Sequence, residues 1–115
     1  MKLTREYLQD LLDEIGLVEK FSRDGEAVFL NDERTQYAIM MAYARIGEIV
    51  KRLPQSLLDS QPQAEWRQVK AFRDVLLHRY DSVNPRRVWE AVEKLAVLKA
   101  ATESLLAAQP DDDDR

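Results

Sequence analysis

The chain has 115 residues, enough for one domain with a hydrophobic core and too few for two. It has no cysteine and one histidine, which excludes disulfide scaffolds, thiolate nucleophiles, cysteine zinc sites and multi-histidine metal centres within one protomer. The net charge is −4, and residues 111–115 contribute −3 of it, so the rest of the chain is almost neutral.

Apolar residues recur every three or four positions and predict helices along most of the chain. We expect Thr4 to cap a first helix over about 5–21, followed by a turn at 22–26 and a short apolar piece at 27–30. Asn31 or Asp32 is expected to cap a second helix, which ends before Pro54. Its middle, residues 37–44, is apolar nearly all round, so it lies either in the core or against a second protomer.

Residues 54–64 contain two prolines and are expected to form a connector. A third helix is predicted from about Glu65 to the histidine at 78. Asn84 and Pro85 then form a strong start signal for a fourth helix that reaches about Ala108. The predicted fold class is all-α, a four-helix up-and-down bundle over residues 1–109, with an acidic, disordered tail at 110–115.

The segment from 67 to 87 is basic within an otherwise acidic chain. It holds six cations and two acids, a local charge of +4. Such a cluster either steers phosphate groups or is an ordinary solvated helical face, and the sequence leaves both open. The candidate RNA-binding residues are Arg67, Lys70, Arg79, Arg86 and Arg87.

Arg73, Asp74, His78 and Tyr80 concentrate reactive groups within eight positions. Arginine and histidine five positions apart differ by about 140° of rotation and about 7.5 Å of rise on a helix. Asp74 and His78 are four apart and share a face, so the carboxylate is expected to orient the imidazole. The alternative interpretation is that these groups only cap the helix and compensate its dipole.

This set of residues suits phosphate chemistry without a metal or cofactor. A histidine can take the proton of an RNA 2′-hydroxyl or give one to the leaving 5′-oxygen, and an arginine can hold the phosphate at two points. One histidine does not easily act as both acid and base. A symmetric homodimer would bring two copies of His78 and Arg73 into one cleft.

Arg73, His78 and Tyr80 form an Arg-x4-His-x-Tyr pattern that resembles the motif of the HepT toxins in the HEPN superfamily. The segments around it are similar to the same family in the same order, and together the match covers about residues 4–100. These segments are Arg45-Ile-Gly-Glu-Ile49, Trp66-Arg-Gln-Val69, Tyr80-Asp-Ser-Val-Asn84 and Val88-Trp-Glu-Ala-Val92.

The resemblance implies an all-helical homodimer in which Arg73 and His78 are the catalytic residues of a metal-independent endoribonuclease. It also implies a toxin–antitoxin pair of the HepT/MntA kind, called type VII. In such a pair a nucleotidyltransferase antitoxin neutralises the toxin by AMPylating the motif tyrosine, here Tyr80. The substrate would be a cellular RNA, either tRNA or mRNA. The alternative is a non-catalytic HEPN protein that binds a nucleotidyltransferase or a nucleotide.

Several residues around the motif carry two interpretations. Glu48 either has an inward role near the dimer cleft or is an ordinary exposed glutamate, and Gly47 either permits close helix approach or is merely tolerated. Trp66 and Trp89 are expected to anchor the core or an interface. Asp74 stands where the family often has asparagine, and Arg79 where it often has a small residue.

The sequence also bears on where the protein works. No apolar run approaches the roughly 18 residues that span a bilayer, so no membrane partner is expected. The N-terminus has an acid at position 6 and lacks the apolar centre of a signal peptide. We therefore expect a cytoplasmic protein.

Overall fold

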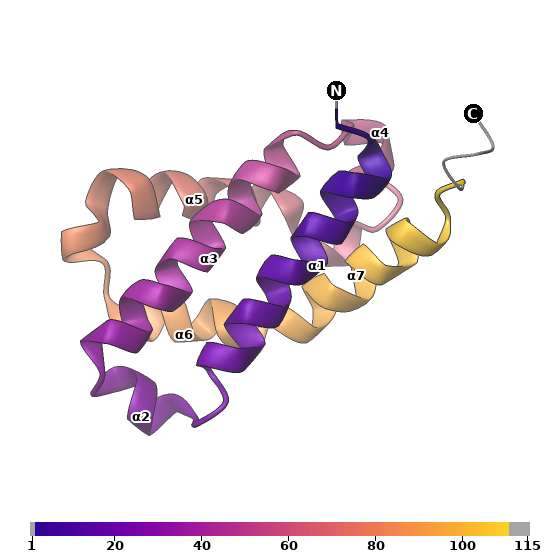
Figure 1. The fold of residues 1–115 in the computed structure, drawn as a ribbon. Helices are drawn as coiled ribbons and strands as arrows, with labels where there is room; N and C mark the ends of the chain where they lie inside the picture. Colours follow the sequence, from indigo (N-terminus) through magenta and orange to yellow (C-terminus); the bar gives the residue numbers. More distant parts are fainter. Residues whose placement is uncertain (1, 111–115) are drawn as a thin grey trace.

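The computed structural model describes residues 2–110, in which all regular secondary structure is helical and no strand occurs (Figure 1). The predicted all-α fold class is confirmed. The helices of the described range are α1 (Thr4–Phe21), α2 (Glu26–Leu30), α3 (Glu33–Lys51), α4 (Gln55–Leu58), α5 (Trp66–Arg79), α6 (Pro85–Glu93) and α7 (Leu95–Ala107). Two 3₁₀ turns, Pro62–Ala64 and Tyr80–Ser82, flank α5. Residues 111–115 of the predicted acidic tail lie outside the described residues.

Two of the three predicted helix caps are confirmed. The Asp32 carboxylate accepts a hydrogen bond from the backbone N–H of Arg34 at 3.1 Å, at the start of α3. Asn84 does the same for Arg86 at 3.0 Å, with Pro85 as the first residue of α6. Thr4 as a cap was wrong: extended Leu3 precedes the helix, its carbonyl accepts from the Tyr7 N–H at 3.0 Å, and no side chain caps α1.

Short helices occupy two segments that the sequence left irregular. The apolar piece at 27–30 belongs to α2, whose Phe29 is buried against Trp89 with ring centroids 5.3 Å apart. The connector at 54–64 contains α4 and a 3₁₀ turn, where the Trp66 indole N–H donates to the Gln61 carbonyl at 2.8 Å. Both tryptophans therefore anchor the core, as predicted.

The predicted fourth helix is divided at Lys94 into α6 and α7. In a continuous helix the Ala91 carbonyl would accept from residue 95. Here it accepts from the Lys94 N–H at 3.1 Å and from the buried Tyr43 hydroxyl of α3 at 2.7 Å. These two donors match the two lone pairs of the carbonyl, so a long-range hydrogen bond accounts for the break.

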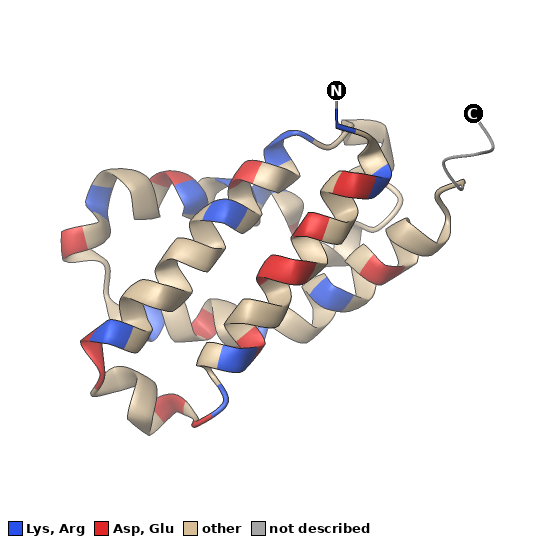
Figure 2. Cartoon of the chain, in the orientation of Figure 1, with Lys and Arg blue, Asp and Glu red and all other residues tan. Residues whose placement is uncertain are grey.

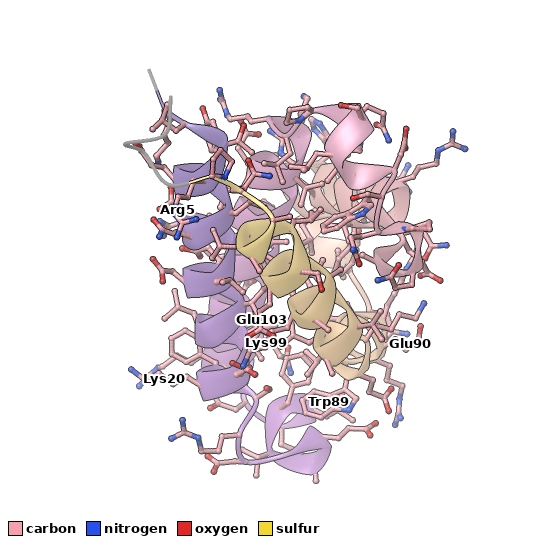
Figure 3. The ribbon with its side chains drawn as sticks, turned by 90° about the vertical axis from the view of Figure 1, so that its right-hand side faces the viewer. Arg5, Lys20, Trp89, Glu90, Lys99 and Glu103 are labelled. Atoms are coloured by element: carbon pink, nitrogen blue, oxygen red, sulfur yellow. The ribbon has the colours of Figure 1, made fainter. Side chains whose placement is uncertain are left out.

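Helix α3 is the central element, and it packs against α1 on one side and α5 on the other (Figure 1). Its inward residues are fully or almost fully buried, whereas Tyr37 and Met41 on its outer face are 47% and 62% exposed. Helix α7 closes the bundle against α1, where Lys99 pairs with Glu19 at 3.0 Å (Figure 3). None of the helices within residues 2–110 is long and apolar enough to cross a membrane.

Candidate active site

Helix α5 carries Arg73, Asp74 and His78, and a backbone contact with α3 fixes its position. A Cβ atom on Gly47 would overlap the Cβ of Arg73 and would lie 3.1 Å from its Cγ. Only glycine at 47 therefore lets the two helices approach this closely, which confirms the first interpretation of Gly47. The contact places the start of the Arg73 side chain against the backbone of α3.

The Arg73 guanidinium lies between two carboxylates. Its Nη2 is 2.7 Å from Oε2 of Glu48, and its Nη1 donates to Oδ1 of Asp74 at 3.0 Å. The side chain is 20% exposed, so this cation is mostly withdrawn from solvent. Glu48 therefore pairs with the motif arginine, and its expected place near a dimer cleft stays a prediction.

Glu48 joins two arginines. Its Oε1 accepts from Arg52 at 2.8 Å, one turn further along α3, while its Oε2 faces Arg73. The hydrogen bond from Arg52, with the positive charges of both arginines, holds the pKa of the Glu48 carboxyl below its ordinary value. The glutamate is therefore fully ionised at neutral pH and forms one network with both cations. Basic and acidic residues both occur along α3 and α5 (Figure 2).

His78 is exposed in the last turn of α5. In the described chain no hydrogen bond joins it to Asp74, contrary to expectation. The Asp74 carboxylate turns instead to Arg73, because a long arginine side chain can reach an adjacent acid that the four-residue spacing rule ignores. No hydrogen bond connects Arg73 to His78 within the described residues.

Tyr80 follows α5 in the 3₁₀ turn and is 58% exposed. Leu77, one turn before it on α5, is 48% exposed. Tyr37 and Met41 are the exposed apolar residues of the neighbouring α3, and Arg73 and Glu48 join the two helices. We define the outer apolar face as Tyr37, Met41, Leu77 and Tyr80.

The candidate RNA-binding cations are accessible but dispersed. Arg67, Arg79, Arg86 and Arg87 are exposed, and Lys70 is partly buried. Arg67 and Arg79 are twelve residues apart on α5, which separates them by about 18 Å along the helix axis. Arg86 has Glu26 of α2 at 4.0 Å. The structure therefore distributes these cations over α5 and α6 instead of gathering them around Arg73.

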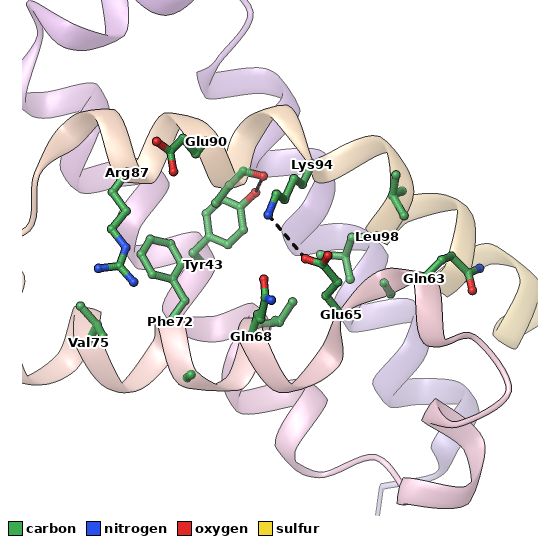
Figure 4. A pocket seen from close by; sticks show the side chains of 15 residues that line it. Tyr43, Gln63, Glu65, Gln68, Phe72, Val75, Arg87, Glu90, Lys94 and Leu98 are labelled. Carbon is green, nitrogen blue, oxygen red and sulfur yellow. Dashed lines mark hydrogen bonds and ion pairs between the residues drawn. The ribbon is translucent and has the colours of Figure 1, made fainter.

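A cavity of about 430 Å³ lies on the other side of α5, between it and helices α6 and α7 (Figure 4). Tyr43 and Phe72 form part of its wall, with ring centroids 5.8 Å apart. Lys94 and Glu65 pair across its rim at 3.5 Å, and Arg87 also lines it. No pattern in the sequence indicates this cavity, because it depends on how helices distant in the chain pack.

Comparison with known proteins identifies relatives over most of the chain. The family model described as Ribonuclease HepT-like matches residues 11–105. A Thermococcus cleftensis protein, provisionally named ribonuclease HepT, is 36% identical over 103 residues, which is 88% of this chain and 94% of that protein. A Methanocaldococcus jannaschii protein, provisionally named an RNase, is 34% identical over 79% of this chain and 76% of its own. A Caldanaerobacter subterraneus protein, also provisionally named an RNase, is 33% identical over 82% of this chain and 85% of its own. No solved structure matches the chain significantly.

Proposed function

This chain belongs to the HepT-like ribonuclease family, and from that premise we propose that it is a metal-independent endoribonuclease with Arg73 and His78 as its catalytic residues. The observation that carries the proposal is the family match over residues 11–105, which includes both side chains. Two features of the site support it: a guanidinium held in one place against α3, and an imidazole open to solvent.

The chemistry follows from these two groups. His78 takes the proton of an RNA 2′-hydroxyl, whose oxygen attacks the adjacent phosphorus. Arg73 stabilises the charge that develops on the phosphate oxygens. The bond from phosphorus to the 5′-oxygen breaks, and that oxygen receives a proton from a second acid. The products are a 2′,3′-cyclic phosphate and a 5′-hydroxyl end.

The second acid is best supplied by another copy of the chain. The outer apolar face lies on and just after the two helices that Arg73 and Glu48 join, and exposed apolar side chains of this kind are typical of an interaction surface. A two-fold dimer through this face would bury Tyr37, Met41 and Leu77 and would place the two His78 side chains near one cleft. We therefore propose a homodimer as the active form.

Tyr80 is the proposed point of regulation by a cognate nucleotidyltransferase antitoxin of the MntA kind. Its phenol is accessible at 58% exposure and lies two residues after His78. Transfer of AMP to the tyrosine oxygen, with release of pyrophosphate from ATP, would add bulk and negative charge beside His78. Both would hinder the approach of RNA, which supports the assignment of this chain as the toxin of the pair.

RNA cleavage in the presence of EDTA tests the activity. We expect wild-type protein to cut single-stranded RNA to cyclic phosphate ends. Arg73→Ala and His78→Ala are expected to lose about 10²-fold or more in rate, whereas Arg67→Ala, the matched loss of an exposed cation, should lose only a few-fold. Folded wild type that cuts no RNA, or an undiminished His78→Ala rate, would contradict the proposal.

The alternative function is a non-catalytic protein that binds a nucleotidyltransferase. One observation favours it: both terminal nitrogens of Arg73 already have carboxylate partners. Intact mass after incubation with ATP and the transferase separates the two cases when it is paired with the cleavage assay. Addition of AMP that is abolished by Tyr80→Phe, in a protein that cleaves RNA, supports the toxin. Tight transferase binding by a protein without cleavage supports the alternative.

A further inference from the structure

The two carboxylates on Arg73 differ in how firmly they are held. The Glu48 side chain is 38% exposed and the Asp74 side chain 64%. Glu48 comes from another helix, whereas Asp74 is the next residue of the same helix. These differences suggest that the two acids do not share one task.

Glu48 is fixed from several directions. Its Oε1 is bound by Arg52, its backbone follows the glycine that contacts α5, and its Oε2 is shielded from solvent together with Nε of Arg73. Loss of Glu48 would leave a mostly buried guanidinium without its main partner, and the guanidinium would have to move.

Asp74 is held much less firmly. Adjacent residues on a helix project about 100° apart, so the contact of Asp74 with Arg73 depends on the length and flexibility of the arginine side chain. Ion pairs as exposed as this one contribute at most about 1 kcal/mol. The Oδ1 atom of Asp74 accepts a hydrogen bond from the Nη1–H group of Arg73. The same kind of N–H group binds a phosphate oxygen in arginine–phosphate pairs.

We propose that Glu48 is a positioning residue that fixes Arg73, and that Asp74 occupies the place of the RNA phosphate until substrate displaces it. The proposal rests on the ribonuclease function above and adds how its arginine is controlled. In the free protein the charges of Arg73, Arg52, Glu48 and Asp74 sum to zero. When RNA binds, the Asp74 carboxylate turns to solvent, and one phosphate oxygen takes its hydrogen bond with Nη1.

Kinetics on the full-length protein separate the two roles. For Asp74→Asn we expect KM for RNA to fall about 3- to 5-fold, the equivalent of the exposed ion pair, with kcat within about 2-fold. For Glu48→Gln we expect kcat to fall about 10-fold or more, with a smaller change in KM. Asp81→Asn is the matched control, because it removes one exposed acid close to the site without touching Arg73.

Two kinetic results would overturn the proposal. An equal fall in KM for RNA in Asp74→Asn and Asp81→Asn would mean that only the net charge of the protein affects RNA binding. An unchanged kcat in Glu48→Gln would mean that Arg73 does not need its partner. If circular dichroism shows that Glu48→Gln does not fold, Arg52→Gln is the second variant, because it removes the hydrogen bond that holds Glu48. A smaller loss in kcat is expected for it.

A readout without catalysis keeps the proposal distinct from the ribonuclease function. The guanidinium ¹⁵N signals of Arg73, assigned with Arg73→Lys, report whether its terminal nitrogens are held. We expect Glu48→Gln to average these signals, and Asp74→Asn to leave Nη2 held while binding 2′-O-methyl RNA about 3- to 5-fold more tightly than wild type. If these NMR and binding results are found in a protein without nuclease activity, they would support the displacement of Asp74 by the RNA phosphate and contradict the ribonuclease function. Signals that are insensitive to Glu48→Gln would reject the positioning role even in an active nuclease.

Discussion

On its α3 side, helix α5 touches the backbone of its neighbour, whereas on its α6 and α7 side a cavity of about 430 Å³ separates the helices. The close contact depends on Gly47 and brings with it the ion pair between Arg73 and Glu48. The open side is spanned at its rim by the pair of Lys94 and Glu65 at 3.5 Å. One helix therefore has a tightly constrained side and a loosely packed side.

The difference shows how this small domain places a charged group. A flexible arginine gains a defined position when its own Cβ is wedged against a neighbouring helix, because the first torsion angles are then fixed by packing. The charge network only completes what the backbone contact begins. The loosely packed side offers no such constraint, and the following predictions test whether the contrast holds in solution.

The largest effect is expected from Gly47→Ala. The added methyl group would overlap the Cβ of Arg73, which is attached directly to the backbone and is unable to swing away. We expect a loss of about 2–3 kcal/mol in the free energy of unfolding, measured by urea denaturation, in spite of the better helix propensity of alanine.

Gly16→Ala is the control for that variant. Gly16 lies within α1, and a Cβ atom there would meet nothing within 4 Å. The same substitution should therefore stabilise the protein by about 0.5–1 kcal/mol. Equal effects of the two substitutions would show that α3 and α5 are not in close contact in solution.

Tyr43→Phe is expected to have the next largest effect, and it tests the boundary between the two sides. Burial raises the pKa of the Tyr43 phenol, so it stays protonated and donates to the Ala91 carbonyl at 2.7 Å. Removing the hydroxyl deletes this hydrogen bond while the ring remains, at a cost of about 1–1.5 kcal/mol in thermal or urea unfolding. Tyr37→Phe, an exposed tyrosine on the same helix, should change stability by less than about 0.5 kcal/mol. If both variants cost the same, the hydrogen bond does not hold α6 in place.

Local signals in the sequence were sufficient to predict the long helical segments, but not the short helices α2 and α4 or the contacts between helices. Periodic apolar residues and the caps Asp32 and Asn84 act within a few positions, so the sequence shows them directly. The division at Lys94 depends on a hydrogen bond from Tyr43 to Ala91, which are 48 residues apart. No local pattern reports such a bond.

The candidate site divides in the same way. The residue types of Arg73 and His78 indicate phosphate chemistry from the sequence alone. The partner of Asp74 could not be predicted from the sequence, because it depends on where Arg73 is held. Glu48 is 25 positions from Arg73, and its glycine neighbour was the one sequence feature that could have indicated a close helix contact.

A pH titration of stability is expected to show a smaller effect, confined to the constrained side. The folded-state pKa of Glu48 lies below its ordinary value, so the folded state binds the proton less readily than the unfolded chain. The contribution of Glu48 is therefore fully present near neutral pH and is lost as the pH falls through the acidic range. Unfolding of wild type and Glu48→Gln should differ most near neutral pH, and the difference should shrink as the pH falls below the ordinary range of a glutamate carboxyl. A difference that does not change with pH across the acidic range would mean that the ion pair with Arg73 and Arg52 is not its cause.

The smallest effect is expected from Ala71→Leu on the loosely packed side. Ala71 is exposed and lines the cavity, so the larger side chain can extend into free space, and leucine is nearly as good a helix former as alanine. We expect a change within about 0.5 kcal/mol in the free energy of unfolding. Ala42→Leu is the matched comparison, because Ala42 is 3% exposed inside α3 and overpacking there should cost about 1–3 kcal/mol. A loss above about 1 kcal/mol for Ala71→Leu would mean that α6 and α7 close onto α5 in solution, and the contrast between the two sides of α5 would then disappear.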